Sequence, residues 1–381
     1  VLEPYLEPPD PTEDTLSFST HIEVADVYFL MDTTGSMGGE IANLRTSLRT
    51  TVIPGIEATI SDVWFGVGGF DDYPCCGYGD ALSGDLAFYN RQYMTNSAAA
   101  AQTAVDSLSS HYGADGPESD VPALHAVATG CGDGTGSNAV PNDPGGACTD
   151  ADLIGYPHFR SGAVPIIVLM TDDVFHNGPT GGSPYGSIPG VTPPTYAATA
   201  AALNSIYARV IGVNSGGARA DLEAIARDTG TVDAGGVPFV YDISGTGSGL
   251  GSQVIDAVAD VSGGVPMDIT AIPIDDPSDA VDAVAAFIER IIPNTTAGAP
   301  CTPGLATTDH DGDGEDETFV DVIPGTMVCF DIIPRENDTV EPTADPQTFM
   351  ATIQVWGDHV TVLDDRDVYF LVPPEVPGPQ G

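Results

Sequence analysis

The chain has 381 residues, of which 55 are acidic and 10 are basic, and its formal net charge is -45. Every basic residue is an arginine, and no apolar run approaches the roughly 18–20 residues that span a bilayer. Nucleic acid and anionic membrane surfaces would be repelled by this charge, whereas cations would be attracted. An acidic surface tuned for solubility or high salt would show the same imbalance, so the charge alone does not identify a partner.

The first 20 residues are acidic and rich in proline, and weak strand alternation follows in LSFSTHIE. The segment ADVYFLMD is a continuous apolar run that ends in Asp32, which is typical of a strand buried on both faces of a sheet. A helix is predicted next, because apolar residues recur at helical spacing from Ile41 to Ile56. A second buried strand, DVWFGVGGF, leads into Asp71 and Asp72.

Strands and helices continue to alternate after this point. Helices are predicted over Ser97–Leu108 and Val121–Ala128, a long surface loop over Gly130–Pro157, and a third buried strand in VPIIVLMTDD. A Gly/Pro loop from Gly178 to Pro194 precedes two further helix–strand pairs and a last helix near residues 254–261. This alternation predicts an α/β domain over residues 21–265 with a doubly wound, mostly parallel sheet and flanking helices.

The pattern changes after Pro266. Short β segments, among them TFVDVI, MVCFDIIP and FMATIQVW, are separated by Pro, Gly, Asp and Asn. They predict an all-β sandwich over residues 266–375, followed by a linker over 376–381. A helix is expected from Asp279 to Ile291, where it would close the α/β domain or join the two domains.

The six cysteines fit neither a zinc framework nor a C-x-x-C redox motif. Their even number and Gly/Pro-rich surroundings favour disulfides and an oxidising compartment. We expect Cys131–Cys148 to close a loop and Cys301–Cys329 to join two parts of the last domain. Cys75 and Cys76 would form a vicinal bridge or remain two free thiols. The Pro-rich start shows no signal peptide, which suggests a segment of a longer secreted or surface protein.

Oxygen-bearing residues lie in three separated segments, two of which leave predicted strands. They are Asp32-x-Thr34-x-Ser36, Asp115-Gly-Pro-Glu118 and Thr171-Asp172-Asp173. Parallel strands of an open α/β sheet bring such positions to one edge. Hydroxyls, carboxylates and waters suit a hard cation such as Mg²⁺. The plain alternative for the first segment is a strand–helix turn whose hydroxyl caps the helix.

These motifs carry a family resemblance. FLMDTTGSM resembles the metal-ion-dependent adhesion site of the von Willebrand factor A superfamily, and the other two segments follow in that family's order. FGVGGFDDYP, DGPESD and IIVLMTDDVFH are most similar to the integrin β-subunit I-like domain, and the tail resembles the integrin hybrid domain. The resemblance implies that residues 1–20 add a strand to the sandwich. It also implies that Asp32, Thr34, Ser36, Glu118 and Asp172 bind Mg²⁺ or Mn²⁺.

The resemblance further implies a neighbouring Ca²⁺ site made by Asp72, Asp115, Glu118 and the Pro117 carbonyl. Gly113 departs from this pattern, because an asparagine would be expected there. A third integrin ion site needs two acids after the serine motif, and only Glu40 is present, since Gly39 occupies the other position. We do not expect that third site to bind an ion.

Three other acids and two single residues are weaker candidates. Asp309, Asp311 and Asp313 alternate as in a calcium loop, but an EF-hand would need a glutamate at Val320, so a solvated acidic loop is the alternative. His176 could orient a ligand or be a satisfied loop histidine. Asp71 has no assigned partner, and we expect it to be solvated.

These observations predict an extracellular, secreted or cell-surface adhesion module that binds an Asp or Glu side chain of a protein partner through the cation. The acidic charge predicts no nucleic-acid binding, and the lack of a long apolar run predicts no membrane insertion. We expect no enzymatic activity, because the chain has no G-x-S-x-G, no H-E-x-x-H and no clustered histidines. The alternatives are a surface or surface-layer module that calcium only braces, and a metal-assisted hydrolase.

Overall fold

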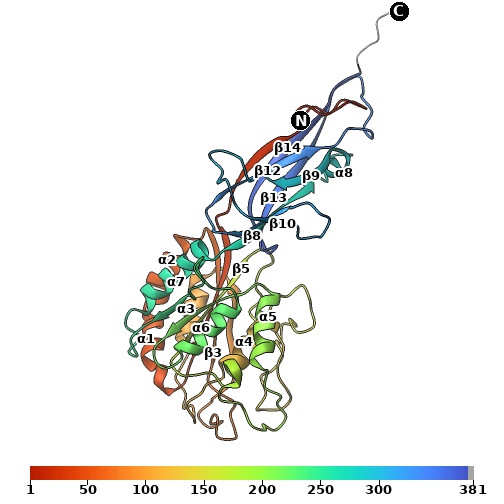
Figure 1. The fold of residues 1–381 in the computed structure, drawn as a ribbon. Coiled ribbons are helices and arrows are strands. Elements are labelled where there is room, and N and C mark those ends of the chain that lie inside the picture. The colour runs from red at the N-terminus through yellow and green to blue at the C-terminus, as the bar shows by residue number, and fades with distance from the viewer. Residues whose placement is uncertain (376–381) are drawn as a thin grey trace, which may run out of the picture. The chain divides into compact units, whose positions relative to one another are not determined.

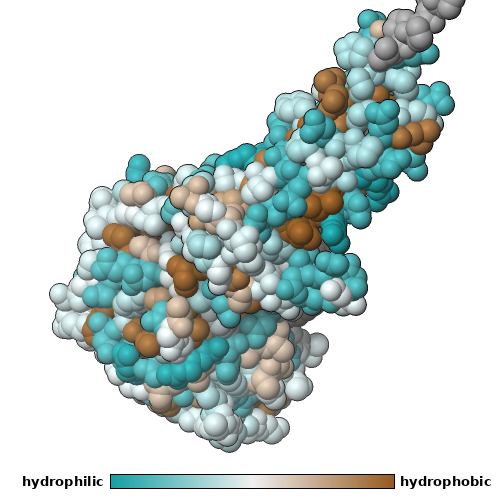
Figure 2. Space-filling view, turned by 45° about the horizontal axis from the view of Figure 1, so that its top comes forward, coloured by the Kyte–Doolittle hydropathy of each residue, from teal (hydrophilic) through white to brown (hydrophobic). Residues whose placement is uncertain are grey.

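The computed structural model describes residues 1–375 and divides the chain into two compact units. One unit is Ile22–Val265, and the other combines Val1–His21 with the chain from Pro266 onward. The linker that the sequence predicts over 376–381 lies outside the described residues. No helix within the described part is long and apolar enough to cross a bilayer. On the face drawn in Figure 2, hydrophobic residues appear as separate small areas.

The unit Ile22–Val265 is built on a six-stranded sheet in the order β4-β3-β2-β5-β6-β7, in which only β4 is antiparallel to its neighbour. Helices flank the sheet (Figure 1), and the predicted mostly parallel α/β architecture is confirmed. The strands are β2 (Val24–Asp32), β3 (Asp62–Phe70), β4 (Tyr89–Thr95), β5 (Val164–Thr171), β6 (Arg209–Asn214) and β7 (Val240–Asp242).

The helices follow the predicted positions to within a few residues. The π-helical turn over Leu48–Val52 separates α1 from α2, so the single helix expected over this stretch has three segments. The helices are α1 (Gly38–Ser47), α2 (Ile53–Glu57), α3 (Ala98–Asp106), α4 (Asp120–Thr129), α5 (Tyr196–Ser205), α6 (Arg219–Asp228) and α7 (Leu250–Gly264).

Apolar strands make the core of this unit. All eight residues of β5 are buried, as are eight of the nine in β2, which is the burial expected for central strands covered on both faces. At the amino end of these strands, the buried Asp26 accepts bonds from the N–H and the guanidinium of Arg160 at 2.6 and 2.7 Å. Arg160 also bonds Asp62 and lies over the ring of Trp64. One arginine therefore ties β2 and β3 together at this edge.

The second unit contains two antiparallel sheets, β1-β12-β9 and β10-β11-β8-β13-β14. Phe18 of the first sheet contacts Phe330 of the same sheet, and Phe330 contacts Phe319 of the other. Residues 14–19 pair with β12, so the N-terminal segment belongs to this unit. The strands are β1 (Asp14–Ser19), β8 (Met267–Asp275), β9 (Ile288–Pro293), β10 (Thr307–Thr308), β11 (Thr318–Val322), β12 (Met327–Pro334), β13 (Gln347–Gly357) and β14 (Thr361–Val372).

The helix expected from Asp279 to Ile291 is wrong at both ends. Only α8 (Ala283–Phe287) is helical, and Ile288 begins β9. The Asp282 side chain caps α8 by accepting the Ala285 N–H at 2.9 Å, so the helix starts later than predicted. Pairing of β9 with β12 places the following β-branched residues in the sheet.

Three disulfides are present: Cys75–Cys76 and Cys131–Cys148 in the α/β unit, and Cys301–Cys329 in the β unit. None of the six cysteines is free.

We predict that Arg160→Gln lowers the free energy of unfolding by roughly 3 kcal/mol, because it leaves the buried Asp26 without its basic partner. Arg219→Gln is the matched control, since Arg219 is 46% exposed and pairs with Glu223 and Asp242 at the surface. That change should cost less than about 1 kcal/mol. Urea unfolding of the two variants measures both values, and equal losses would contradict the role given to Arg160.

Candidate metal centre

The strand order brings three acid-bearing chain segments to one edge of the sheet. β2 lies between β3 and β5, with Asp32 level with Phe70 of β3 and Met31 level with Met170 of β5. Asp72 follows β3 and Asp172 follows β5. These segments therefore leave the carboxyl edge side by side, where ligands of open α/β sheets bind.

A network of hydroxyls joins Asp32 to Asp172. The buried Asp32 accepts the N–H and the hydroxyl of Thr34 on Oδ1 at 2.8 and 2.7 Å, and the hydroxyl of Thr171 on Oδ2 at 2.8 Å. Thr34 Oγ1 lies 3.3 Å from Ser36 Oγ, and the Ser36 hydroxyl donates to Asp172 Oδ1 at 3.1 Å. Four of the five residues predicted for the central cation are thus connected.

Glu118 reaches the same place through its backbone. Its N–H donates to the Val174 carbonyl at 2.9 Å, and its carbonyl accepts the His176 N–H at 2.8 Å. A Cβ added at Gly113 would lie 3.2 Å from Thr34 Cγ2 and 3.5 Å from Glu118 Oε1, so both residues border this glycine. Glu118 is buried, and its Oε2 has no hydrogen-bond partner in the described chain.

Gly113 itself has a φ of +58°. A side chain at this position would need a rarely adopted backbone conformation and would press against Thr34. The glycine that departs from the family pattern fits this conformation, and it offers no side chain as a ligand.

Burial dominates the electrostatics of this group of acids. It raises the pKa of Asp32 to about 7, against the hydrogen bonds from Thr34 and Thr171. Burial, with the charges of Asp32 and Asp72, raises the pKa of Glu118 to about 12. Burial also raises the pKa of Asp172. Buried carboxylates that lack enough donors for their oxygens fit a divalent cation, which would neutralise them and fill their open coordination.

A second group lies beside the first. Single ligand atoms of Asp72, Asp115 and His176 all lie within 4.8 Å of one another. His176 Nε2 is 3.2 Å from Asp115 Oδ2 and 3.5 Å from Asp72 Oδ2. Pro117 lies in the same loop, between Asp115 and Glu118. The structure therefore brings two of the four residues predicted for a calcium ion, Asp72 and Asp115, together with His176.

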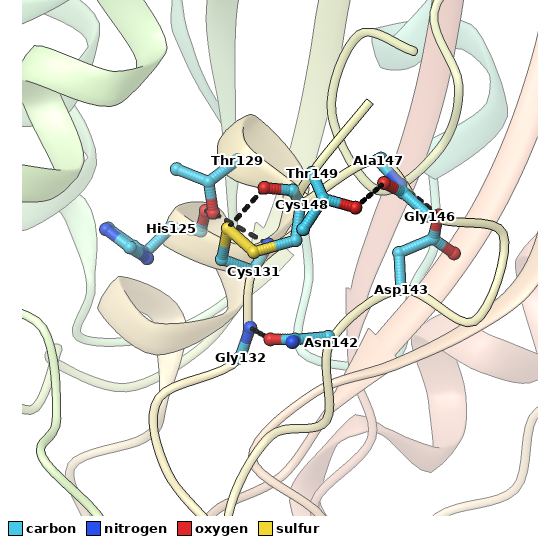
Figure 3. The surroundings of a disulfide bond; sticks show 10 residues. All are labelled: His125, Thr129, Cys131, Gly132, Asn142, Asp143, Gly146, Ala147, Cys148 and Thr149. Atoms are coloured by element: carbon cyan, nitrogen blue, oxygen red, sulfur yellow. Dashed lines mark hydrogen bonds between the residues drawn. A yellow bond between two sulfur atoms is a disulfide. The ribbon is translucent and has the colours of Figure 1, made fainter. Parts of the chain in front are cut away.

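Two loops support this second group. The Tyr185 hydroxyl donates to Asp72 Oδ1 at 2.7 Å, and its ring stacks on His176 with the ring centres 4.2 Å apart. The loop that carries Tyr185 is joined to the Cys131–Cys148 loop, because the Thr135 N–H donates to the Gly190 carbonyl at 2.8 Å. Figure 3 shows that disulfide with the bond from the Gly132 N–H to the Asn142 side chain.

The expectation that Asp71 is solvated is wrong, because its side chain is fully buried. Its carboxylate accepts the Thr33 hydroxyl at 2.7 Å, the Leu86 N–H at 3.2 Å and a bond with His111 Nδ1 at 2.8 Å. The bond to Asp71 raises the pKa of His111. Asp85 lies close to both, but it is held by the N–H groups of residues 80, 112 and 113. No sequence spacing indicated this cluster, because His111 comes 40 residues after Asp71.

The weaker candidates have different surroundings. Glu40 is buried, and neither of its carboxylate oxygens makes a hydrogen bond within the described residues. Burial raises the pKa of Glu40. Asp309, Asp311 and Glu317 form a compact acidic group in the loop between β10 and β11, without Asp313. The two carboxylate oxygens of Asp309 accept hydrogen bonds from the N–H groups of Gly312 and Gly314 at 2.6 and 2.8 Å, so each oxygen already has a backbone donor. The loop is thus hydrogen-bonded internally, as a turn without an ion would be.

No protein-family model matches the sequence, and no curated protein matches it. Solved structures that match the chain include a von Willebrand factor type A protein from Catenulispora acidiphila, with 14% identity and a TM-score of 0.38 over 98% of this chain. The pilus adhesin SpaC from Lactobacillus rhamnosus GG, in its open conformation, matches with 13% identity and a TM-score of 0.39 over 94%. Proximal thread matrix protein 1 from the mussel byssus matches with 11% identity and a TM-score of 0.35 over 66%.

The chain spans 75% of the length of the first of these proteins, but only 45% of the pilus adhesin and 48% of the mussel protein. Their identities and TM-scores are low.

We predict that, without divalent cations, the protein becomes less stable as the pH rises from about 4 through about 7. The unfolded acids lose their protons near pH 4, whereas Asp32, with a folded pKa of about 7, and Glu118 keep theirs, so the folded state binds more protons over this range. Thermal unfolding in EDTA across this range measures the slope. Glu118→Gln should reduce the slope, and stability that rises with pH would contradict the assigned burial of these acids.

Proposed function

We infer that the unit Ile22–Val265 binds Mg²⁺ or Mn²⁺ and uses it to bind a carboxylate of a protein partner. Asp32, Thr34, Ser36, Glu118 and Asp172 would hold the cation, some of them through water. One observation carries this proposal. The hydroxyl network joins Asp32 to Asp172 beside a buried glutamate that has an unpartnered oxygen.

The donor set suits such a role. Hydroxyls and carboxylates are the oxygen ligands that Mg²⁺ prefers, and the ion usually keeps several waters. The hydroxyls of Thr34 and Ser36 are neutral, so they leave more of the cation's charge for an incoming anion. When bound, the cation would supply a positive site for a carboxylate oxygen. The residues of the chain would hold and orient the cation.

The residues of the centre differ in depth. Asp32 and Glu118 are buried, whereas Ser36 is exposed and Asp172 is only partly buried. A cation between them would be enclosed on the side of the sheet and approachable from the side of Ser36. This asymmetry supports binding of a partner rather than a closed structural ion. A module braced only by calcium would need protein ligands on all sides.

A Ca²⁺ ion at the neighbouring group would be held by Asp72, Asp115, Glu118 and the Pro117 carbonyl. His176 contacts two of these acids, and Tyr185 bonds Asp72. Glu118 would be shared by both ions. The loop from Gly178 to Pro194 would then present its surface next to the adhesion site, where it can contribute to the choice of partner.

The resemblance to the integrin β I-like domain supports an adhesive rather than an enzymatic role, with the β unit as a counterpart of the hybrid domain. The three disulfides support an extracellular or cell-surface location, because disulfides persist in oxidising compartments. The net charge of -45 opposes nucleic acid and also opposes an acidic partner at long range. Recognition would therefore depend on contacts within about 8 Å at physiological salt.

We predict that the protein binds to beads coated with succinylated albumin in Mg²⁺ and is released by EDTA. Beads whose carboxylates are blocked as methyl esters should not retain it, because an ester cannot replace the anionic oxygen. Asp172→Ala should lower retention at least about tenfold, while unfolding stays cooperative. Asp106→Asn on the exposed surface of α3 is the matched control for charge.

Magnesium-dependent retention that survives Asp172→Ala would overturn the residue assignment. Equal retention on both kinds of bead would overturn carboxylate recognition. Crystals grown in Mn²⁺ give a direct check, because anomalous scattering locates the ion relative to Asp32, Glu118 and Asp172.

A further inference from the structure

Asp120 is the first residue of α4, and the charge of Asp32 acts on its carboxyl group. It is fully buried. The preceding residue fixes its position, because the Ser119 hydroxyl donates to the carbonyls of Asp71 and Ala87 at 2.9 and 2.7 Å, and the Ser119 N–H donates to the Asp71 carbonyl at 3.1 Å. Glu118 is two residues earlier. The backbone that positions Glu118 therefore positions Asp120 as well.

Neither carboxylate oxygen of Asp120 has a hydrogen-bond partner in the described chain, apart from the N–H of its own residue. The charges that act on it come from Asp32, Asp221 and Asp72, and all of them are negative. Asp221 does not provide a hydrogen-bond donor for Asp120, because the Asp221 carboxylate is itself an acceptor, bonded by the Phe175 N–H at 2.9 Å. The described surroundings thus contain acids but no basic group for Asp120.

The position at the start of a helix does not explain this residue. An aspartate in the first turn normally stabilises a helix from a solvated position, where it meets the free N–H groups and the helix dipole. Asp120 is buried instead, and no side chain caps the N-terminus of α4. Removing a carboxylate from water without a donor or counter-charge costs several kcal/mol.

Two neighbouring acids share this lack of partners. Glu118 Oε2 and Asp72 Oδ2 are also buried without a hydrogen bond. Three acids from two chain segments therefore have buried oxygens that make no hydrogen bond in the described chain, although His176 Nε2 lies 3.5 Å from Asp72 Oδ2. A cation with its water ligands would satisfy all of them, since it supplies both positive charge and O–H donors.

We propose that Asp120 is a further acid of the metal centre, whose carboxylate stabilises the bound cation from the buried side by accepting a hydrogen bond from a water ligand. This inference rests on the proposed cation site. It assigns a separate role to a residue that the adhesion motif does not include. Asp172 and Ser36 would face the partner, whereas Asp120 would set how tightly the ion is held.

Mn²⁺ titration of the metal-free full-length chain tests this role. The free ion is measured by electron paramagnetic resonance in the unsubstituted protein, Asp120→Asn and Asp106→Asn. Asparagine has nearly the same volume as aspartate but no charge. Asp120→Asn should weaken Mn²⁺ binding by about 10–100-fold, and Asp106→Asn should leave it unchanged.

A second measurement separates this inference from the adhesive function. At saturating Mn²⁺, Asp120→Asn should still bind carboxylate beads as the unsubstituted protein does, because the outer ligands are intact. Mn²⁺ affinity within twofold of the unsubstituted protein would overturn the role of Asp120 and leave the adhesion site standing. An unsubstituted protein that binds no Mn²⁺ would overturn both.

The stability of Asp120→Asn in EDTA is the remaining control. The variant should unfold at the same or a higher temperature than the unsubstituted protein, since it removes a buried acid that has no partner in the described chain. A variant that fails to fold would contradict the proposal, because the carboxylate would then stabilise the fold itself rather than the ion.

Discussion

Buried carboxylates need donors or positive charge, and this chain meets that need in two different ways. At the amino edge of the parallel sheet, Asp26 is bonded by Arg160. In the loop after α4, Asp143 accepts bonds from Tyr93, His158 and the Ala147 N–H. At the carboxyl edge, hydroxyls serve Asp32, but oxygens of three other acids remain without partners. Glu40 of α1 and Glu3 of the β unit also have buried oxygens without hydrogen-bond partners among the described residues.

The topology of the sheet creates that place. β2 lies between β3 and β5, so the chain segments that follow these strands must leave the sheet as neighbours. The backbone bonds of Glu118 to Val174 and His176 bring a fourth segment against them. Apolar strands that are buried along nearly their whole length supply the stability on which this crowding of like charges depends. A bound cation would attract each of these carboxylates and so offset the repulsion among them.

Much of this arrangement could be predicted from the sequence. Continuous apolar runs indicated the central strands, and residues at the ends of those runs indicated the site, because both signals are local in the chain. The burial of Asp71 could not be predicted, since it depends on His111, which is distant in sequence. Asp120 was missed because an acid at a helix start is normally solvated. The strand β9 was read as helix, since its partner β12 lies about 40 residues further along the chain.

The distribution of arginine over the chain has a further consequence for the loops around the site. Neither residues 92–159 nor residues 161–208 contain a lysine or an arginine. They include the Cys131–Cys148 loop, Glu118, Asp172 and Tyr185. Trypsin-like proteases cleave after basic residues at exposed, mobile chain. Arg160 is the one basic residue between these stretches, and its contacts with Asp26 and Asp62 hold it in place. Digestive enzymes of this specificity would find no cleavage point among the loops that surround the acids.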